Sequence, residues 1–250
     1  MKGDVLYGGT KAFVFREAAE FLKTKKPLPA ELYEALDDAC KAKAFSVAGY
    51  TSIELLQKFL EGLTKAVEQG KTKEAFLEEM NRFLDEQGYK GLNPWRADII
   101  FRTNLQTAYN VGHYKAMTEE TAKKLRPYWQ YKTAVDGHVR ESHAVMEGRV
   151  YPADDPIWNV WYPPNGFRCR CMVVSLSKAQ VDARGLKVER EPPVELDFET
   201  GELKPLFPDK GFSCNPAKTT WKADLSGIPE RLKELYEERK PESPKSKPGA

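Results

Sequence analysis

The spacing of apolar residues divides this chain into a helical first part and a mixed second part. Between Thr10 and Val111, apolar residues recur every three or four positions, which predicts amphipathic helices. From Arg126 the period changes to two, with Trp129 and Tyr131 on one face of an aromatic and β-branched stretch. This change predicts a strand over residues 126–135.

Capping residues set the limits of the predicted helices. Thr72 and Asn93 precede apolar periodic runs, Pro94 follows Asn93 at the first helical position, and Gly88 stands just past a run. Predicted helices cover 10–24, 30–44, a run from a Thr51–Glu54 capping box to about Gly70, 72–88, and a longest helix from Asn93.

The second part combines short elements with loops. We expect a short helix from Asp136, as N-cap, to Gly148, an ordered irregular loop at 151–167, and a strand at 168–176. Further expected elements are a helix from Ser177 to Ala183, an extended arm over 192–208 with a turn at Thr200-Gly201, a short helix within 225–239, and a tail at 240–250 that is disordered by composition.

These elements predict an α+β fold with a helical N-terminal half, a small mixed α/β domain and an extended C-terminal tail. The predicted boundaries are 1–92 for the helical region, 93–185 for the α+β core domain, and 186–250 for the arm and tail.

Composition narrows the function classes. The chain has 250 residues, of which 30% are charged, with a formal net charge of +2. This balance argues against a dedicated nucleic-acid binder, although basic residues could still gather on one face. A polar N-terminus and the lack of a long apolar run predict a protein that is cytosolic or assembled from the cytosol, with no membrane partner. Four cysteines favour reduced thiols or a metal site over a disulfide framework.

One constellation has the chemistry of a metal site. Cys169 and Cys171 are two residues apart, so on a strand both thiols point to one face. His143 shares the apolar face of the preceding helix with Met146 and could approach them. One imidazole and two thiolates suit zinc. His143, Cys169 and Cys171 are therefore a candidate zinc site.

The fourth ligand stays open at this point. His138, Asp136, Cys214 and a water molecule are all candidates. The competing interpretation is structural: two buried strand cysteines beside a hydrogen-bonded core histidine.

Several residues near the constellation are better explained by structural roles. Asp136 and Arg140 are spaced to pair on one helix face, and Arg140 could brace the 151–167 loop. Arg168 and Arg170 flank the cysteines and are expected on a solvated strand face. Three tryptophans, Trp129, Trp158 and Trp161, are expected to pack the irregular loop.

Familiar catalytic motifs are missing from the sequence. It contains no glycine-rich phosphate loop, no Gly-x-Ser-x-Gly and no His-Glu-x-x-His. A nucleophile such as Cys169 or Cys171 with His143 as base is conceivable, but no third group to orient the base is evident. We therefore predict no catalytic residues.

Taken together, the motifs resemble the phage Mu F-like minor head proteins, the head morphogenesis family. The matching pieces are the Phe13–Lys26, Lys43–Gly49 and Arg102–Asn110 segments, Gly211-Phe212 and Asn215-Pro216, and above all a clasp of Asp136, Arg140, His143, Gly148, Pro164 and Asn165, followed by Cys169-Arg170-Cys171. Together they cover residues 10–220. Two departures are Arg168, where the family often has Asn, and Asn104, where it often has Glu.

The resemblance implies a minor head (capsid) protein of a tailed phage or prophage. Such a protein acts in head morphogenesis at the portal and procapsid interior, with portal, capsid and scaffold proteins as partners, and assists DNA packaging or exit. Its expected location is the virion head, after assembly in the host cytoplasm.

Two other function classes compete with this one. The first is an enzyme, either a zinc- or thiol-dependent hydrolase or an ADP-ribosyltransferase-like transferase, that uses the His143, Cys169 and Cys171 cluster. The second is a DNA-binding module, which would show salt-sensitive binding.

Overall fold

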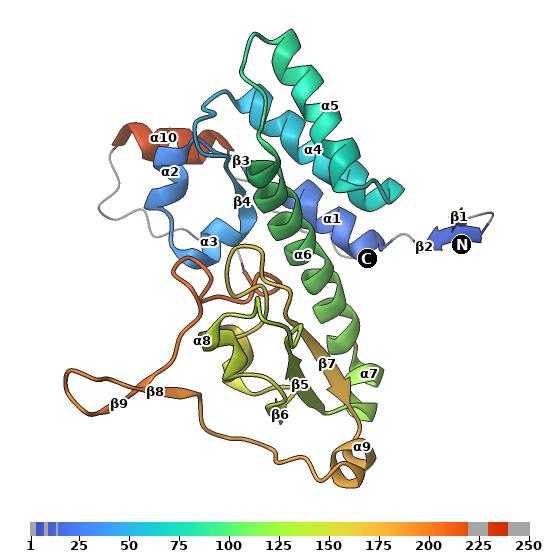
Figure 1. Cartoon of the computed structure of the whole chain (residues 1–250), viewed down its shortest axis with the longest axis vertical. Coiled ribbons are helices and arrows are strands. Elements are labelled where there is room, and N and C mark those ends of the chain that lie inside the picture. Colours follow the sequence, from blue (N-terminus) through green and yellow to red (C-terminus); the bar gives the residue numbers. More distant parts are fainter. Residues whose placement is uncertain (1–3, 8–9, 14, 220–229, 240–250) are drawn as a thin grey trace, which may run out of the picture.

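The computed structural model describes residues 4–7, 10–13, 15–219 and 230–239, and helices dominate its first half (Figure 1). These helices are α1 (Arg16–Thr24), α2 (Ala30–Ala35), α3 (Asp38–Lys43), α4 (Ile53–Gln69), α5 (Lys73–Glu86), α6 (Pro94–Thr118) and α7 (Glu120–Leu125). Two small strand pairs accompany them: β1 (Asp4–Tyr7) with β2 (Thr10–Phe13), antiparallel, and β3 (Lys26–Pro27) with β4 (Ala44–Phe45), parallel.

Most predicted helix ends are confirmed. The Thr72 side chain accepts a hydrogen bond from the Ala75 amide, and Asn93 accepts one from Arg96. Gly70 and Gly88 adopt φ of +64° and +73°, the left-handed conformation that glycine takes most easily after a helix.

Three helix predictions for the first half need correction. The first helix begins at Arg16 rather than Thr10, because Thr10–Phe13 instead pairs with Asp4–Tyr7 as a hairpin. The 30–44 helix divides at Leu36, which turns to an extended ψ of 152° and buries its side chain. The cap of α4 is Ser52 rather than Thr51, since the Ser52 hydroxyl accepts from the Leu55 amide.

The helices enclose the largest apolar core of the described residues. Helix α1 packs across both α4 and α6, while α5 covers another side of α4. Their buried faces meet in a cluster whose largest side chains are Phe21, Phe59 and Phe76. The approach of α1 to α6 is close, since a Cβ at Gly112 would lie 2.7 Å from the Phe15 ring.

The second part is built on a three-stranded antiparallel sheet. Its order is β6 (Val150–Pro152), β5 (Tyr128–Lys132), β7 (Met172–Leu176), so β5 is central. β7 begins later than the predicted strand, β5 is shorter than the predicted 126–135 strand, and β6 was not predicted. Arg168 adopts a left-handed φ of +59°, so the predicted 168–176 strand begins only at Met172. Directly after β5, the Thr133 amide donates to the Glu147 carboxylate instead of a strand neighbour.

The second core is aromatic and lies between this sheet and the last turns of α6. Trp129 contacts the Tyr114 ring edge-on at 5.6 Å and the Trp158 ring at 5.6 Å. Trp158 and Trp161 are each 1% exposed, which confirms that they pack the 151–167 loop. Within that loop the chain is irregular except for the end of β6 and a 3₁₀ turn at Pro156–Asn159.

The remaining elements are α8 (Glu141–Ala144), α9 (Lys178–Ala183), β8 (Val194–Leu196), β9 (Leu203–Pro205) and α10 (Glu230–Arg239). Ser177 and Gln180 form a complete capping box, as the predicted cap implies. The expected extended arm is a β8–β9 hairpin that stands away from the body (Figure 1). Its turn includes the predicted Thr200-Gly201, with Gly201 at φ +72°. Residues 225–229 of the predicted last helix and the 240–250 tail lie outside the described residues.

The described residues therefore confirm an α+β fold with a helical first half. The domain boundaries at 92 and 185 remain predictions. Within the described ranges, no helix combines the length and apolar character needed to cross a membrane.

Lys25 is the most unusual ionisable group of the helical half. It follows α1, is 7% exposed, and donates from Nζ to the Ala44 carbonyl at 2.9 Å. Burial, helped by the charge of Lys43, lowers the pKa of Lys25 to about 7. The folded protein therefore binds a proton at Lys25 less tightly than the unfolded chain does.

We predict that Lys25→Met stabilises the protein at pH 6 by about 1–3 kcal/mol, because it removes a buried charge. Between pH 7 and 10 the unfolded wild-type chain binds more protons at this lysine than the folded one, so wild-type stability rises with pH. The variant should lose that rise, as measured by urea unfolding at pH 6 and pH 9. Lys26→Met is the control, and equal pH slopes for wild type and Lys25→Met would contradict the prediction.

Candidate metal centre

The segment between β5 and β7 brings the three predicted metal ligands together. His143 lies on α8 (Glu141–Ala144), and Cys169 and Cys171 lie just before β7. His143 Nδ1 is 3.9 Å from the Cys169 sulfur and 3.8 Å from the Cys171 sulfur. The side chains are 2%, 4% and 3% exposed, so the cluster is enclosed by protein.

The orientation of the imidazole is fixed by its other nitrogen. His143 Nε2 lies 3.1 Å from the Asn165 carbonyl oxygen and 3.7 Å from Asp209 Oδ1. Both neighbours are acceptors, so Nε2 carries the proton and donates to Asn165. In that tautomer the Nδ1 lone pair faces the two sulfurs.

Asn165 connects the members of the cluster. It is 0% exposed. Its backbone N–H donates to the Cys169 sulfur, and its side-chain Oδ1 accepts from the Tyr131 hydroxyl at 2.7 Å. Burial raises the pKa of Tyr131 well above 10, so the hydroxyl remains a donor. The Asn165 Nδ2 is also buried, and has no hydrogen-bond partner within the described part of the chain.

The two sulfurs share one negative charge more readily than they hold two. The hydrogen bond with Cys171 lowers the pKa of Cys169, assisted by hydrogen bonds from the backbone N–H groups of Asn165 and Cys171. The same contact raises the pKa of Cys171. One thiolate is thus stabilised by donors that converge on Cys169.

The remaining clasp residues hold the loop from outside. Arg140 Nη2 donates to the Phe167 carbonyl at 2.8 Å, which agrees with the predicted brace, and Arg140 Nε lies 3.2 Å from Asp209 Oδ2. Pro164 is buried directly before Asn165. Gly148, at φ +77°, lets its amide donate to the Tyr131 carbonyl at 3.0 Å.

The predicted Asp136–Arg140 pair is not formed. Asp136 instead makes a two-pronged ion pair with Arg170, with both distances 2.6 Å, and this pair holds the pKa of Asp136 down at about 2. Asp136 also does not cap a helix, since α8 begins only at Glu141. Arg168 pairs with Asp98 at 2.8 Å, so neither Arg168 nor Arg170 faces solvent alone.

The candidate fourth ligands lie elsewhere. Asp136 and His138 are exposed, and the Cys214 thiol donates to the Asp38 carbonyl at 3.2 Å. Across the described residues, the metal-ligating group at this place consists of His143, Cys169 and Cys171, whose ligand atoms all lie within 4.8 Å of one another.

Sequence reasoning missed Asp209, which contacts both Arg140 and His143. It lies in the segment after the β8–β9 hairpin, and its amide donates to the Asn165 carbonyl at 3.0 Å. The nearby Gly211-Phe212 motif was the sequence signal that could have pointed to this turn. In the structure, Gly211 adopts φ +90° in the turn that follows Asp209.

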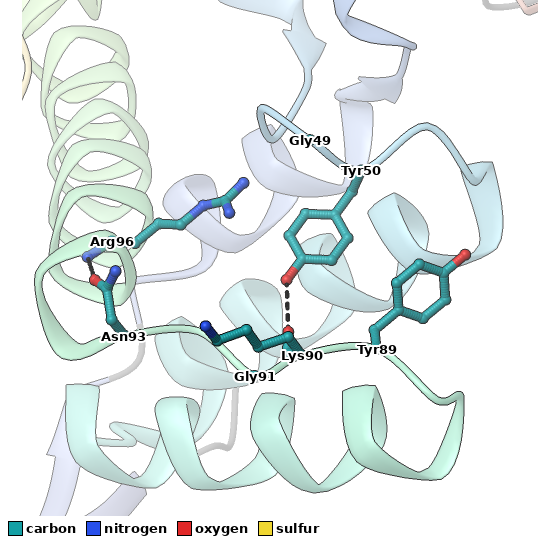
Figure 2. Close-up of a pocket in the computed structure, with 7 residues that line it drawn as sticks. All are labelled: Gly49, Tyr50, Tyr89, Lys90, Gly91, Asn93 and Arg96. Carbon is teal, nitrogen blue, oxygen red and sulfur yellow. Dashed lines mark hydrogen bonds between the residues drawn. The ribbon is translucent and has the colours of Figure 1, made fainter.

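A separate hollow of about 410 Å³ opens between the turn after β4, the segment after α5 and the first turn of α6 (Figure 2). Its lining residues are Gly49, Tyr50, Tyr89, Lys90, Gly91, Asn93 and Arg96. The Arg96 guanidinium stacks on the Tyr50 ring at 4.9 Å, and the Tyr50 hydroxyl donates to the Lys90 carbonyl. Its two basic side chains favour anions. The sequence did not predict this hollow, because its lining residues come from three separate segments.

Comparison with known proteins relates the chain to phage head proteins. Residues 57–174 match the family model described as Phage Mu protein F like protein. The chain is 33% identical over 232 residues to capsid assembly protein F of Escherichia phage Mu, a match covering 78% of this chain and 52% of that protein. It is 35% identical over 190 residues to the Mu-like prophage FluMu F protein of Haemophilus influenzae, covering 68% and 45%.

The chain therefore spans about half the length of the curated relatives it matches. No solved structure matches it significantly.

We predict that Gly166→Ala destabilises the clasp. A Cβ at Gly166 would lie 2.2 Å from Asp209 Oδ2 and 3.2 Å from Arg140 Nη1, so the ion pair would have to move. The expected loss is about 1–3 kcal/mol in unfolding free energy, measured by urea denaturation. Gly137→Ala is the matched control, because a Cβ there meets nothing within 4 Å. Equal stability of the two variants would contradict the prediction.

Proposed function

The chain belongs to the Phage Mu protein F like family, and we propose that it is a minor head protein that acts in head morphogenesis of a tailed phage or prophage. The observation that carries this proposal is the 33% identity to Mu capsid assembly protein F over most of the chain.

The site chemistry supports an assembly role over an enzymatic one. A thiol nucleophile or a catalytic zinc needs a path for substrate, whereas His143, Cys169 and Cys171 are each at most 4% exposed. The groups around them fix positions: Asn165 holds the imidazole, and Arg140 holds the loop. The zinc- or thiol-dependent hydrolase and the ADP-ribosyltransferase-like alternative therefore have less support.

We place the protein at the portal and procapsid interior, with portal, capsid and scaffold proteins as its partners. Assembly occurs in the host cytoplasm and the protein stays in the virion head. The net charge of +2 gives the chain no large basic excess. A contribution to DNA packaging or exit would therefore depend on local contacts with DNA.

We predict that deleting the gene for this chain from its phage or prophage lowers the yield of DNA-filled heads, because an assembly step is lost. Electron microscopy of induced lysates and nuclease-protected DNA would measure the yield, and expression of the chain in trans should restore it. A tagged copy should co-sediment with portal and capsid protein in gradient-purified particles.

Two results would argue against this function. One is a normal yield of infectious, filled heads after the deletion. The other is turnover of a nucleotide or peptide substrate that Cys171→Ser abolishes while the melting curve is unchanged, which would favour an enzyme.

A further inference from the structure

We propose that His143, Cys169 and Cys171 bind a zinc ion that fastens the segment after β5 to the start of β7. The site is independent of the proposed function and rests on geometry. Three soft or borderline ligand atoms from two distant segments converge on one enclosed point, with Nδ1–sulfur distances of 3.9 Å and 3.8 Å.

These separations fit a tetrahedral metal. With Zn–S of about 2.3 Å and Zn–N of about 2.0–2.1 Å, tetrahedral geometry puts nitrogen and sulfur ligands about 3.6 Å apart. The observed distances exceed this by a few tenths of an ångström, well within reach of side-chain rotation. Bound zinc would take both cysteines as thiolates and release their protons to solvent.

The surroundings match those of a ligating histidine. A metal-bound imidazole usually donates its other N–H to a carbonyl or carboxylate, which fixes the ring. His143 does so to the Asn165 carbonyl, with Asp209 close by. Asn165 thus touches the imidazole through its oxygen and Cys169 through its amide.

Asn165 also indicates what completes the coordination. Its Nδ2 is buried and lacks a partner among the described residues, which is costly for an amide. Asp136, His138 and Cys214 do not reach the cluster, so the fourth ligand is a water molecule, which can accept a hydrogen bond from Nδ2. Three protein ligands and a water are the coordination of catalytic zinc sites, but the enclosure of all three ligands leaves no path for a substrate, so we assign the ion a structural task.

The test uses the full chain and zinc alone. Purified protein should contain one equivalent of zinc by elemental analysis. After denaturation with a chelator, protein refolded without metal should melt at least about 10 °C lower than protein refolded with zinc. Cobalt in place of zinc should give the intense thiolate-to-cobalt absorption of a two-thiolate site.

Variants separate the site from general folding defects. Cys171→Ser and His143→Ala should lose zinc, whereas Cys214→Ser, which changes a thiol outside the cluster, should keep one equivalent. If Cys171→Ser fails to fold, the cobalt spectrum of the wild type still decides. The proposal is overturned if wild-type protein binds neither metal and melts at the same temperature with and without chelator, or if Cys214→Ser abolishes binding.

Discussion

The second half of the protein depends on one constraint. Polar groups that are buried in a segment without regular structure need hydrogen-bond partners. Residues 153–171 lie between strands, so their backbone and side-chain groups cannot rely on a ladder of sheet hydrogen bonds. Asn165 supplies three of the missing partners, to His143, Tyr131 and Cys169. These three bonds satisfy polar groups that lie buried beside the aromatic core.

Charge pairs act on the outside of the same loop. Arg140 joins Asp209 and the Phe167 carbonyl, while Arg170 joins Asp136. Exposed ion pairs contribute little free energy individually, but each of these connects segments that are far apart in sequence. Their main effect is to select one path for the chain around the buried cluster, into which Gly166 fits because it lacks a Cβ.

Local signals in the sequence predicted much of the helical half, and long-range contacts account for what was missed. Thr72, Asn93 and Gly88 act within one turn of a helix, so their roles can be inferred from neighbours alone. The partners of Asp136 and Arg140 are set by tertiary packing, which helix spacing cannot reveal. His143, Cys169 and Cys171 were identified by residue type, although the cysteines precede the strand expected to align them. Asp209 had no comparable chemical signal.

Helix α6 belongs to both cores, and this has a thermodynamic consequence. Ala97, Ile100 and Ala108 face the helical core, whereas Met117 faces the aromatic one. At 25 residues it is about 37 Å long, and one continuous ladder of hydrogen bonds runs through it. Melting either core would expose one end of this helix and weaken the other. The two halves should therefore unfold in a single cooperative transition, despite their different architectures.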